Sequence, residues 1–171
     1  DMKPILLPHL LQHRVLAPAL LACAMVLACP VALSQTNAKA AGFYEDALAR
    51  FDKKDMPGAI IQLKNALQID PSMLSVQLLL GKALLRNGEV AAAEVAFNEA
   101  LRLGVNRAEV VLLLGQTYMA QGKHNLVLEQ NLFKPAGLPP AVQLQLRVLL
   151  ASIYGDLGEP AKALREVDEA R

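Results

Sequence analysis

Apolar and polar residues are distributed along most of this chain with the spacing of amphipathic helices, and the helices recur at a fixed interval. The stretch 74–107, LSVQLLLGKALLRNGEVAAAEVAFNEALRLGVNR, contains two such helices joined by Asn87-Gly88. Small residues stand 34 residues before and after Gly81, and again 36 residues further on, at Ala47, Gly115 and Ala151. A constant period of this kind indicates stacked copies of one helix-turn-helix unit.

The turn between the two helices of each unit follows the same period. Gly88, Gly122 and Gly158 stand in register, and Lys54 takes the place of the glycine in the first unit. The period therefore predicts four units, which span about 40–73, 74–107, 108–143 and 144–171.

The boundaries of several helices are marked by capping and breaking residues. Asp55 is expected to cap a helix with Pro57 in its first turn, where a missing N–H costs nothing. Asp70-Pro71 closes that helix, because proline disfavours helix in the residue before it, and Gly104 supplies a C-terminal stop. The predicted helices span about 38–53, 56–69, 72–86, 89–103, 107–120, 124–133, 141–156 and 160 to the end, with 124–133 the weakest and a proline-containing loop over 134–140.

Composition agrees with a helical array and excludes several functions. The chain is 54% hydrophobic but only 4% aromatic, without tryptophan, which is typical of helices rich in alanine and leucine. From position 35 onward it has 15 basic and 15 acidic residues, so no basic stripe indicates binding to nucleic acid. Both cysteines, Cys23 and Cys29, precede the repeats, which excludes a disulfide framework and a thiolate metal site there.

The first 34 residues have the layout of an export signal. Lys3 and Arg14 precede the uncharged run 15–33, and the polar sequence SQTNAK follows. Three interpretations remain: cleavage after Ser34, acylation of Cys29 at the end of the box Val-Leu-Ala-Cys (with Cys23 as a rival), and an uncleaved anchor over 15–33. All three place the rest of the chain outside the cytoplasm, in the periplasm or anchored to a membrane.

The positions of the small and bulky residues resemble those of the tetratricopeptide repeat. The residues that carry the resemblance are Ala47, Ala59, Leu63, Ala66 and Pro71 in the first unit, Leu80-Gly81, Ala93, Phe97 and Ala100 in the second, Leu114-Gly115, Tyr118 and Gly122 in the third, and Leu150-Ala151, Tyr154, Gly158, Ala163, Val167 and Ala170 in the fourth. The third unit departs from the pattern, with Val127, Asn131 and Lys134 where small, aromatic and small residues belong. The resemblance covers about 38–171 and implies an all-α, right-handed superhelical solenoid.

A narrower resemblance concerns the start of the array. The export leader followed by FYEDALARFDKKDMPGAIIQLKNALQIDP is similar to the repeat-containing lipoproteins that accompany the PEP-CTERM and exosortase sorting system and exopolysaccharide loci. This resemblance implies an envelope scaffold in polysaccharide export or protein sorting, and a family whose members contain many more repeats.

Catalytic and cofactor chemistry finds no support in the residues. His124 has no histidine or cysteine partner within the repeats and is interpreted as a packing or capping residue. Neighbouring carboxylates such as Glu45 and Asp46 diverge on a helix, and no glycine-rich segment has phosphate-loop spacing. We therefore expect no enzyme activity, cofactor, metal or small-molecule substrate in this segment.

The remaining candidate site is the inner surface of the array, which the first helix of each unit is expected to line. We predict a groove for an extended peptide or an amphipathic helix, formed by Tyr44, Leu48, Phe51, Leu78, Lys82, Leu85, Arg86, Leu112, Gln116 and Met119. Tyr44 and Leu48 occupy the places where some tetratricopeptide domains clamp a C-terminal carboxylate, which disfavours that mode.

The sequence thus favours a non-enzymatic protein-interaction scaffold in the bacterial envelope, linked to exopolysaccharide export or PEP-CTERM sorting. Two alternatives stay open: a lipoprotein that assists outer-membrane or pilus assembly, and the recognition arm of an enzyme whose catalytic domain lies beyond Arg171.

Overall fold

A computed structural model describes the backbone of residues 29–170 and the side chains of residues 37–170. Most of the predicted leader, including Cys23 and the start of the apolar run 15–33, lies outside the described residues. Residues 39–170 form one compact unit.

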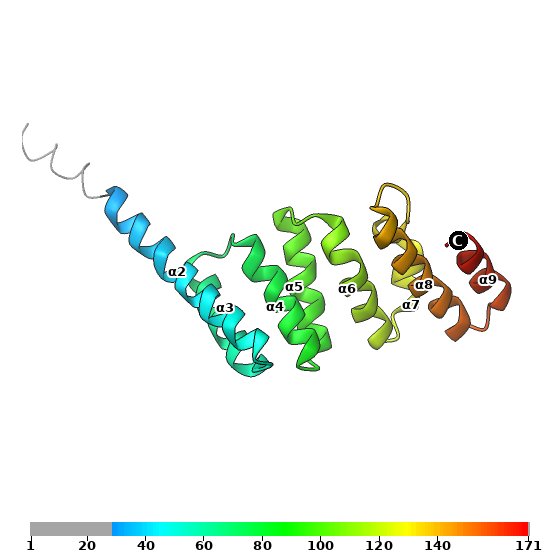
Figure 1. Cartoon of the computed structure of the whole chain (residues 1–171), viewed down its shortest axis with the longest axis horizontal. Helices are drawn as coiled ribbons and strands as arrows, with labels where there is room; N and C mark the ends of the chain where they lie inside the picture. The colour runs from blue at the N-terminus through cyan, green and yellow to red at the C-terminus, as the bar shows by residue number, and fades with distance from the viewer. Residues whose placement is uncertain (1–28, 171) are drawn as a thin grey trace, which may run out of the picture. The chain divides into compact units, whose positions relative to one another are not determined.

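The described residues form helices and turns, with no strand among them. The α-helices are α2 (Cys29–Asp52), α3 (Met56–Ile69), α4 (Leu74–Arg86), α5 (Val90–Leu103), α6 (Arg107–Ala120), α7 (His124–Glu129), α8 (Pro140–Asp156) and α9 (Pro160–Asp168), and the 3₁₀ helix η1 (Asn131–Phe133) follows α7. Figure 1 shows α4, α6 and α8 side by side in chain order, each the first helix of its unit. None of the described helices is long and apolar enough to cross a membrane.

Most helix boundaries fall within one residue of the prediction, and larger differences occur in α2, α4, α7 and at the end of α9. The described part of the first helix starts at Cys29, upstream of the predicted residue 38, and no proline follows Pro30 within it. The predicted helix 72–86 begins at Leu74 instead, because the amide and hydroxyl of Ser72 both donate to the Asp70 carboxylate, at 2.9 and 2.6 Å. This Asx turn occupies Ser72 before the helix can start.

The second helix of the third unit is shorter than the predicted range 124–133. It ends at Glu129, where Gln130 adopts an extended backbone (φ −81°, ψ 134°) before the short η1 turn. The change of direction brings Phe133 to a buried position with its ring centroid 5.9 Å from that of Tyr118. Phe133 thereby supplies the aromatic side chain that Asn131 cannot, two residues later than the period predicts.

The turns within the four units share one backbone conformation. Gly88, Gly122 and Gly158 have φ values of 83°, 68° and 73°, and Lys54 has φ 63° in the equivalent place. Lysine therefore adopts a left-handed conformation that L-residues with a Cβ disfavour. The shared conformation shows that the first unit turns as the others do.

Capping interactions fix helix ends both within and between the units. The Asp55 carboxylate accepts a 3.0 Å hydrogen bond from the Gly58 amide at the start of α3, and Pro57 stands in that first turn, as predicted. The Asn106 side chain accepts one of 2.8 Å from the Ala108 amide at the start of α6. Gly104 ends α5 with φ 104°.

A continuous core runs through the array between the two layers of helices. Within the second unit, Phe97 of α5 is fully buried against α4. Between units, α3 packs on α4, α5 on α6, and α6 on α8. The small residues that let the helices approach are also buried, namely Ala47, Ala59, Ala66, Gly81, Ala93, Ala100 and Gly115. Each unit is thus stabilised both by packing between its own two helices and by packing on its neighbours.

Candidate functional site

A hollow of about 600 Å³ lies between α2, α4 and the start of α6. We call it the first hollow, and its lining consists of Tyr44, Leu48, Leu74, Ser75, Leu78, Leu79, Lys82, Gly104, Val105, Asn106 and Glu109. The α2 and α4 residues come from the first helices of two successive units. Gly104 to Asn106 belong to the connection that leads into α6, and Glu109 stands on α6 itself, so three units contribute to this surface.

The first hollow combines an apolar surface with charge at its sides. Leu48 and Leu74 are 36% and 42% exposed, which is high for side chains of this size. Lys82 is half-buried on α4, and Glu109 is exposed on α6. Exposed apolar side chains rimmed by polar ones are typical of a binding surface for another protein.

A second hollow of about 390 Å³ lies between α6 and α8. Its lining consists of Leu112, Gln116, Met119, Gln145, Val148 and Leu149. Val148 is 55% exposed, and no lysine, arginine or carboxylate is among the lining residues. The second hollow therefore also lies between the first helices of two successive units, but its lining contains no charged side chain.

The ten predicted groove residues divide among three locations. Tyr44, Leu48, Leu78 and Lys82 line the first hollow, and Leu112, Gln116 and Met119 line the second. Phe51, Leu85 and Arg86 line neither: Leu85 packs on the core, and the Arg86 guanidinium lies 4.3 Å above the Phe51 ring. That the seven lining residues bind a partner stays a prediction.

Sequence reasoning missed the residues that connections and helix starts contribute. Gly104 to Asn106 and Glu109 line the first hollow from a connection and from the start of α6, which helical spacing does not predict. Leu74, Ser75 and Leu79 could have been found, because each stands three or four residues from Leu78 or Lys82 on α4. Val148 could also have been found, because it stands in the same register as Leu78 and Leu112. The period identifies equivalent positions on first helices, whereas the approach of a loop depends on packing.

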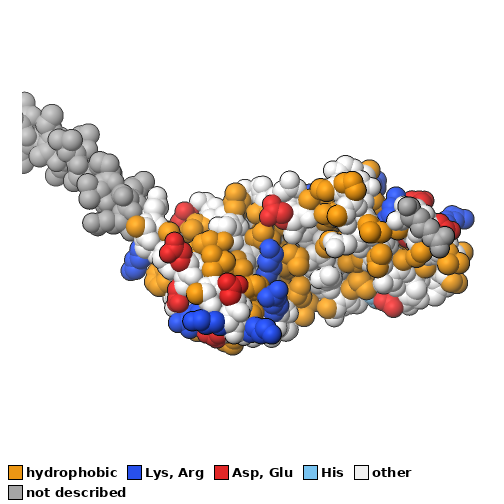
Figure 2. Space-filling model, in the orientation of Figure 1, with side chains coloured by type: hydrophobic (Ala, Val, Ile, Leu, Met, Phe, Trp, Pro, Cys, Tyr) orange, Lys and Arg blue, Asp and Glu red, His pale blue; other side chains and the backbone are white. Residues whose placement is uncertain are grey.

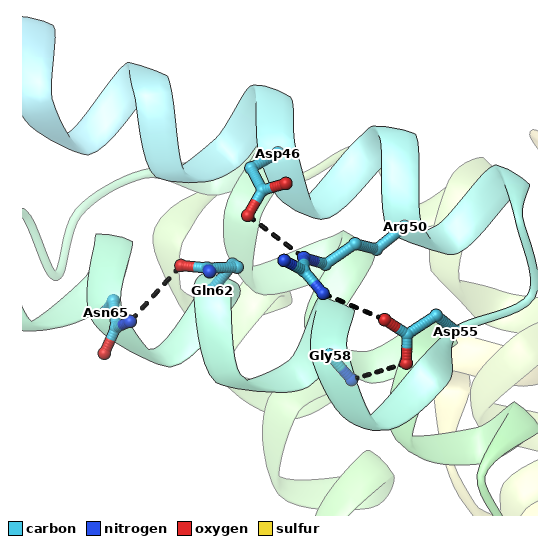
Figure 3. Close-up of polar contacts among 6 residues, drawn as sticks. All are labelled: Asp46, Arg50, Asp55, Gly58, Gln62 and Asn65. Atoms are coloured by element: carbon cyan, nitrogen blue, oxygen red, sulfur yellow. Dashed lines mark hydrogen bonds and ion pairs between the residues drawn. The ribbon is translucent and has the colours of Figure 1, made fainter.

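The charges on the first helices differ in their partners. Arg50 of α2 donates to both Asp46 and Asp55, at 3.0 Å each, in the cluster that also caps α3 (Figure 3). Hydrogen bonding and the charge of Asp46 and Asp55 raise the pKa of Arg50, and the Gly58 amide and Arg50 lower the pKa of Asp55. This cluster ties α2 to α3 at the array's first turn.

The arginines of the two later first helices are also engaged. Arg107 of α6 donates to the carbonyl oxygens of Leu132, Lys134 and Ala136, and Arg147 of α8 pairs with Glu166 of α9 at 3.0 Å. On α4, in contrast, neither Lys82 nor Arg86 has a carboxylate within ion-pair distance among the described residues. Figure 2 shows a short line of lysine and arginine atoms over α4, with hydrophobic atoms on both sides.

His124 stands at the start of α7 and has a structural contact. Its Nε2 lies 3.6 Å from Asp156 Oδ2, at the end of α8, and its side chain is mostly buried. Within the described part of the chain, no group of three or more His, Cys, Asp or Glu side chains could hold a metal ion. His124 therefore packs between the second and first helices of successive units.

The comparisons with known proteins agree with this architecture. A family model for the tetratricopeptide repeat matches residues 34–116. This match covers just under half of the chain and identifies the repeat in that segment. The repeats of residues 117–170 continue the same turns and packing, and no catalytic family is indicated. No curated protein sequence gives a significant match.

Solved tetratricopeptide-repeat structures share the fold. A crystal structure of MamA superposes with a TM-score of 0.67 at 19% identity, over 77% of this chain and 75% of MamA, and a second MamA structure gives 0.66 at 19% identity, over 77% and 71%. The structure of pilF from Pseudomonas aeruginosa gives 0.58 at 18% identity, over 80% of this chain and 61% of pilF. At these identities the likeness shows the fold alone, and it confirms the predicted all-helical repeat solenoid.

Proposed function

We propose that this chain is a non-enzymatic scaffold that holds a segment of a partner protein in the first hollow. The observation that carries the proposal is the first hollow itself, in which exposed Leu48 and Leu74 lie beside Lys82. Burial of apolar side chains supplies the affinity of most such interfaces, and a few polar groups at the edge supply orientation. A tetratricopeptide fold is consistent with protein binding of this kind.

We further propose that the scaffold acts outside the cytoplasm, in exopolysaccharide export or PEP-CTERM sorting. The support is in the sequence: the charged, apolar and polar order of the leader, and the resemblance of the start of the array to lipoproteins of that system. Pilus assembly is the competing role. The likeness to pilF concerns the fold, so it does not favour either role.

Site-specific photocrosslinking tests the binding site. A photoreactive phenylalanine analogue at Leu48 should form an adduct with a defined envelope protein in the producing cells. The matched control is Val95 of α5, which is 69% exposed and lines neither hollow. The same adducts from both positions, or none from Leu48, would refute the proposed site.

A substitution at an exposed position tests the contribution of the hollow to affinity. Leu48→Glu places a charge on the apolar surface and should reduce recovery of the crosslinked partner while helicity by circular dichroism is unchanged. Leu85→Glu combined with Leu112→Glu is a poorer probe, because both leucines also pack against the core. Unchanged recovery with Leu48→Glu would mean that the partner binds elsewhere.

Deletion of the gene separates the two proposed roles. The first role is supported if the deletion strain has normal pili but loses surface polysaccharide. It is also supported if that strain has normal pili but no longer delivers PEP-CTERM proteins to the cell surface. Normal polysaccharide and sorting together with missing pili would overturn it and support pilus assembly.

A further inference from the structure

Lys82, which lines the first hollow, and Arg86, one helical turn further along α4, have no acidic partner within the described residues. Lys82 and Arg86 stand one helical turn apart on α4, so their side chains share a face. Arg50, Arg107 and Arg147, on the first helices of the other three units, are all held by carboxylates or carbonyl oxygens. Positive charge is therefore uncompensated at α4, beside the larger of the two hollows.

The Arg86 side chain is held in a position that suits a carboxylate. Its guanidinium carbon lies 4.3 Å from the centroid of the Phe51 ring, so the ring supports one face of the planar group. Stacking of this kind leaves the N–H edge of the guanidinium available for two parallel hydrogen bonds to a carboxylate. Phe51, which lines neither hollow, thus acts on the site through Arg86.

The apolar part of the surface lies next to these cations. Lys82 lines the first hollow together with the exposed Leu48 and Leu74. Glu109 stands at the start of α6, the helix that follows α4 as first helix of the next unit, and would repel an acidic group there. A bound segment can therefore pair with the cations of α4 and stay clear of Glu109 only if its carboxylates face α4. Its apolar side chains then enter the hollow.

We propose that the occupant of the first hollow is an acidic segment of a partner protein, in which carboxylates alternate with large apolar side chains. Two carboxylates about 6 Å apart would match the spacing of Lys82 and Arg86 along α4. This inference rests on the proposed function and adds the chemistry of the partner. On this proposal the charge of the partner segment decides whether it binds the first hollow. The second hollow, whose lining has no charged side chain, does not select for charge.

Three synthetic peptides test the inference by fluorescence anisotropy on the full chain in a mild nonionic detergent. All have the same leucines, and the intervening residues are glutamate, glutamine or lysine. The glutamate peptide should bind about tenfold more tightly than the glutamine peptide at low salt. That advantage should disappear in Lys82→Gln combined with Arg86→Gln and should shrink as salt is added.

A matched variant controls for net charge. Lys53→Gln combined with Lys64→Gln removes the same two charges from exposed positions outside the hollow, and it should keep the preference for glutamate. Equal loss in both double variants would overturn the inference, because it would show a non-specific effect of net charge.

The remaining outcomes separate this inference from the proposed function. Equal binding of the glutamate and glutamine peptides, preference for the lysine peptide, or binding of none of them would overturn the acidic partner. The adduct at Leu48 would still decide whether the first hollow binds a protein. An adduct that maps to an acidic, leucine-containing segment supports the inference, and one that maps to a segment without carboxylates overturns it.

Discussion

The ring of Phe97 on α5 packs directly against the backbone of Gly81 on α4, in the space that a side chain at position 81 would occupy. A Cβ placed on Gly81 would lie 2.5 Å from Phe97 Cε1. In the third unit the closest neighbour differs, since a Cβ on Gly115 would lie 3.0 Å from Leu149 Cδ1 of α8 and 3.4 Å from Phe133 Cε1. The small residue is therefore required by an aromatic ring within the second unit, and in the third unit mainly by a leucine of the next first helix.

Gly81→Ala is expected to destabilise the array despite the higher helix propensity of alanine. The added methyl group would push Phe97 out of a fully buried position, at a cost of about 1–3 kcal/mol in the free energy of unfolding. Thermal denaturation followed by circular dichroism measures the change.

Gly155→Ala is the matched control, because a Cβ there meets no atom within 4 Å. It should stabilise the chain by up to about 1 kcal/mol, as expected for a helical glycine that packs against nothing. If both substitutions changed stability in the same direction, the contact between Gly81 and Phe97 would not be the reason for the small residue.

Lys54→Gly is expected to stabilise the first turn. Lys54 has φ 63°, in the position that glycine occupies in the other three units. A left-handed L-residue costs about 1–2 kcal/mol, and the greater freedom of glycine in the unfolded chain offsets part of this, about 0.5–1 kcal/mol. The melting temperature should therefore rise slightly, whereas Gly122→Ala, at φ 68°, should lower it. A lower melting temperature for Lys54→Gly would show that the lysine side chain itself contributes.

Arg107→Lys is expected to release the proline-containing loop of the third unit. The guanidinium donates to three carbonyl oxygens, among them those of Leu132 at 2.7 Å and Ala136 at 3.2 Å. Lysine cannot present donors in this fork, so we expect a loss of about 2 kcal/mol and faster amide hydrogen exchange across 131–139. Arg102→Lys, in an exposed pair with Glu99, should have a much smaller effect, because solvent screens that pair. Equal effects would mean that Arg107 does not hold the loop.

The fold could be predicted from the sequence because each unit repeats the same helix-turn-helix pattern. A glycine or lysine at a fixed distance, followed by a cap such as Asp55, identifies the turn without any knowledge of tertiary contacts. The third unit could not be predicted in detail, because its period expands by two residues. The position of Phe133 depends on the extended backbone at Gln130 and on the hydrogen bonds that Arg107 donates to carbonyl oxygens of the loop. Both result from tertiary packing.

The candidate site was predictable only in part. Helical spacing finds Leu48 and Lys82, whose direction follows from their own helices. It cannot show that Glu109 approaches the same hollow, or that Arg86 is turned onto Phe51. Both depend on how one unit is rotated against the next, which a one-dimensional period does not contain.

Cys29→Ser is expected to abolish metabolic labelling with radioactive palmitate if Cys29 is the acylated residue. Cys29 follows the sequence Val-Leu-Ala, in which leucine stands where a smaller residue is usual. Cys23→Ser is the control, because it ends the rival box and leaves Cys29 intact. Labelling that survives Cys29→Ser but not Cys23→Ser would move the lipid to Cys23, and labelling that is missing from the unaltered chain would favour cleavage after Ser34 or a retained anchor.

Glu94 connects the second unit to the third, and this connection should depend on pH. Its carboxylate accepts hydrogen bonds from Lys123 Nζ at 2.6 Å and Gln121 Nε2 at 2.7 Å, which join α5 to the turn after α6. Burial raises the pKa of Glu94, but the bonds from Lys123 and Gln121 outweigh burial and lower the pKa below its ordinary value of 4.5. A depressed carboxyl pKa stabilises the fold above the unfolded value, and this contribution is lost as pH falls through the folded value.

Glu94→Gln should therefore reduce the free energy of unfolding by about 1 kcal/mol at neutral pH, because the charged acceptor for Lys123 is removed. The difference between the variant and the unaltered chain should narrow once the pH drops below 4.5, since the unaltered carboxyl then becomes protonated as well. Thermal denaturation at neutral pH and at pH values below 4.5 measures the difference in stability between the variant and the unaltered chain. Glu129→Gln, at an exposed position, is the control. A gap that stays constant or widens in acid would mean that the ion pair does not stabilise the contact between the units.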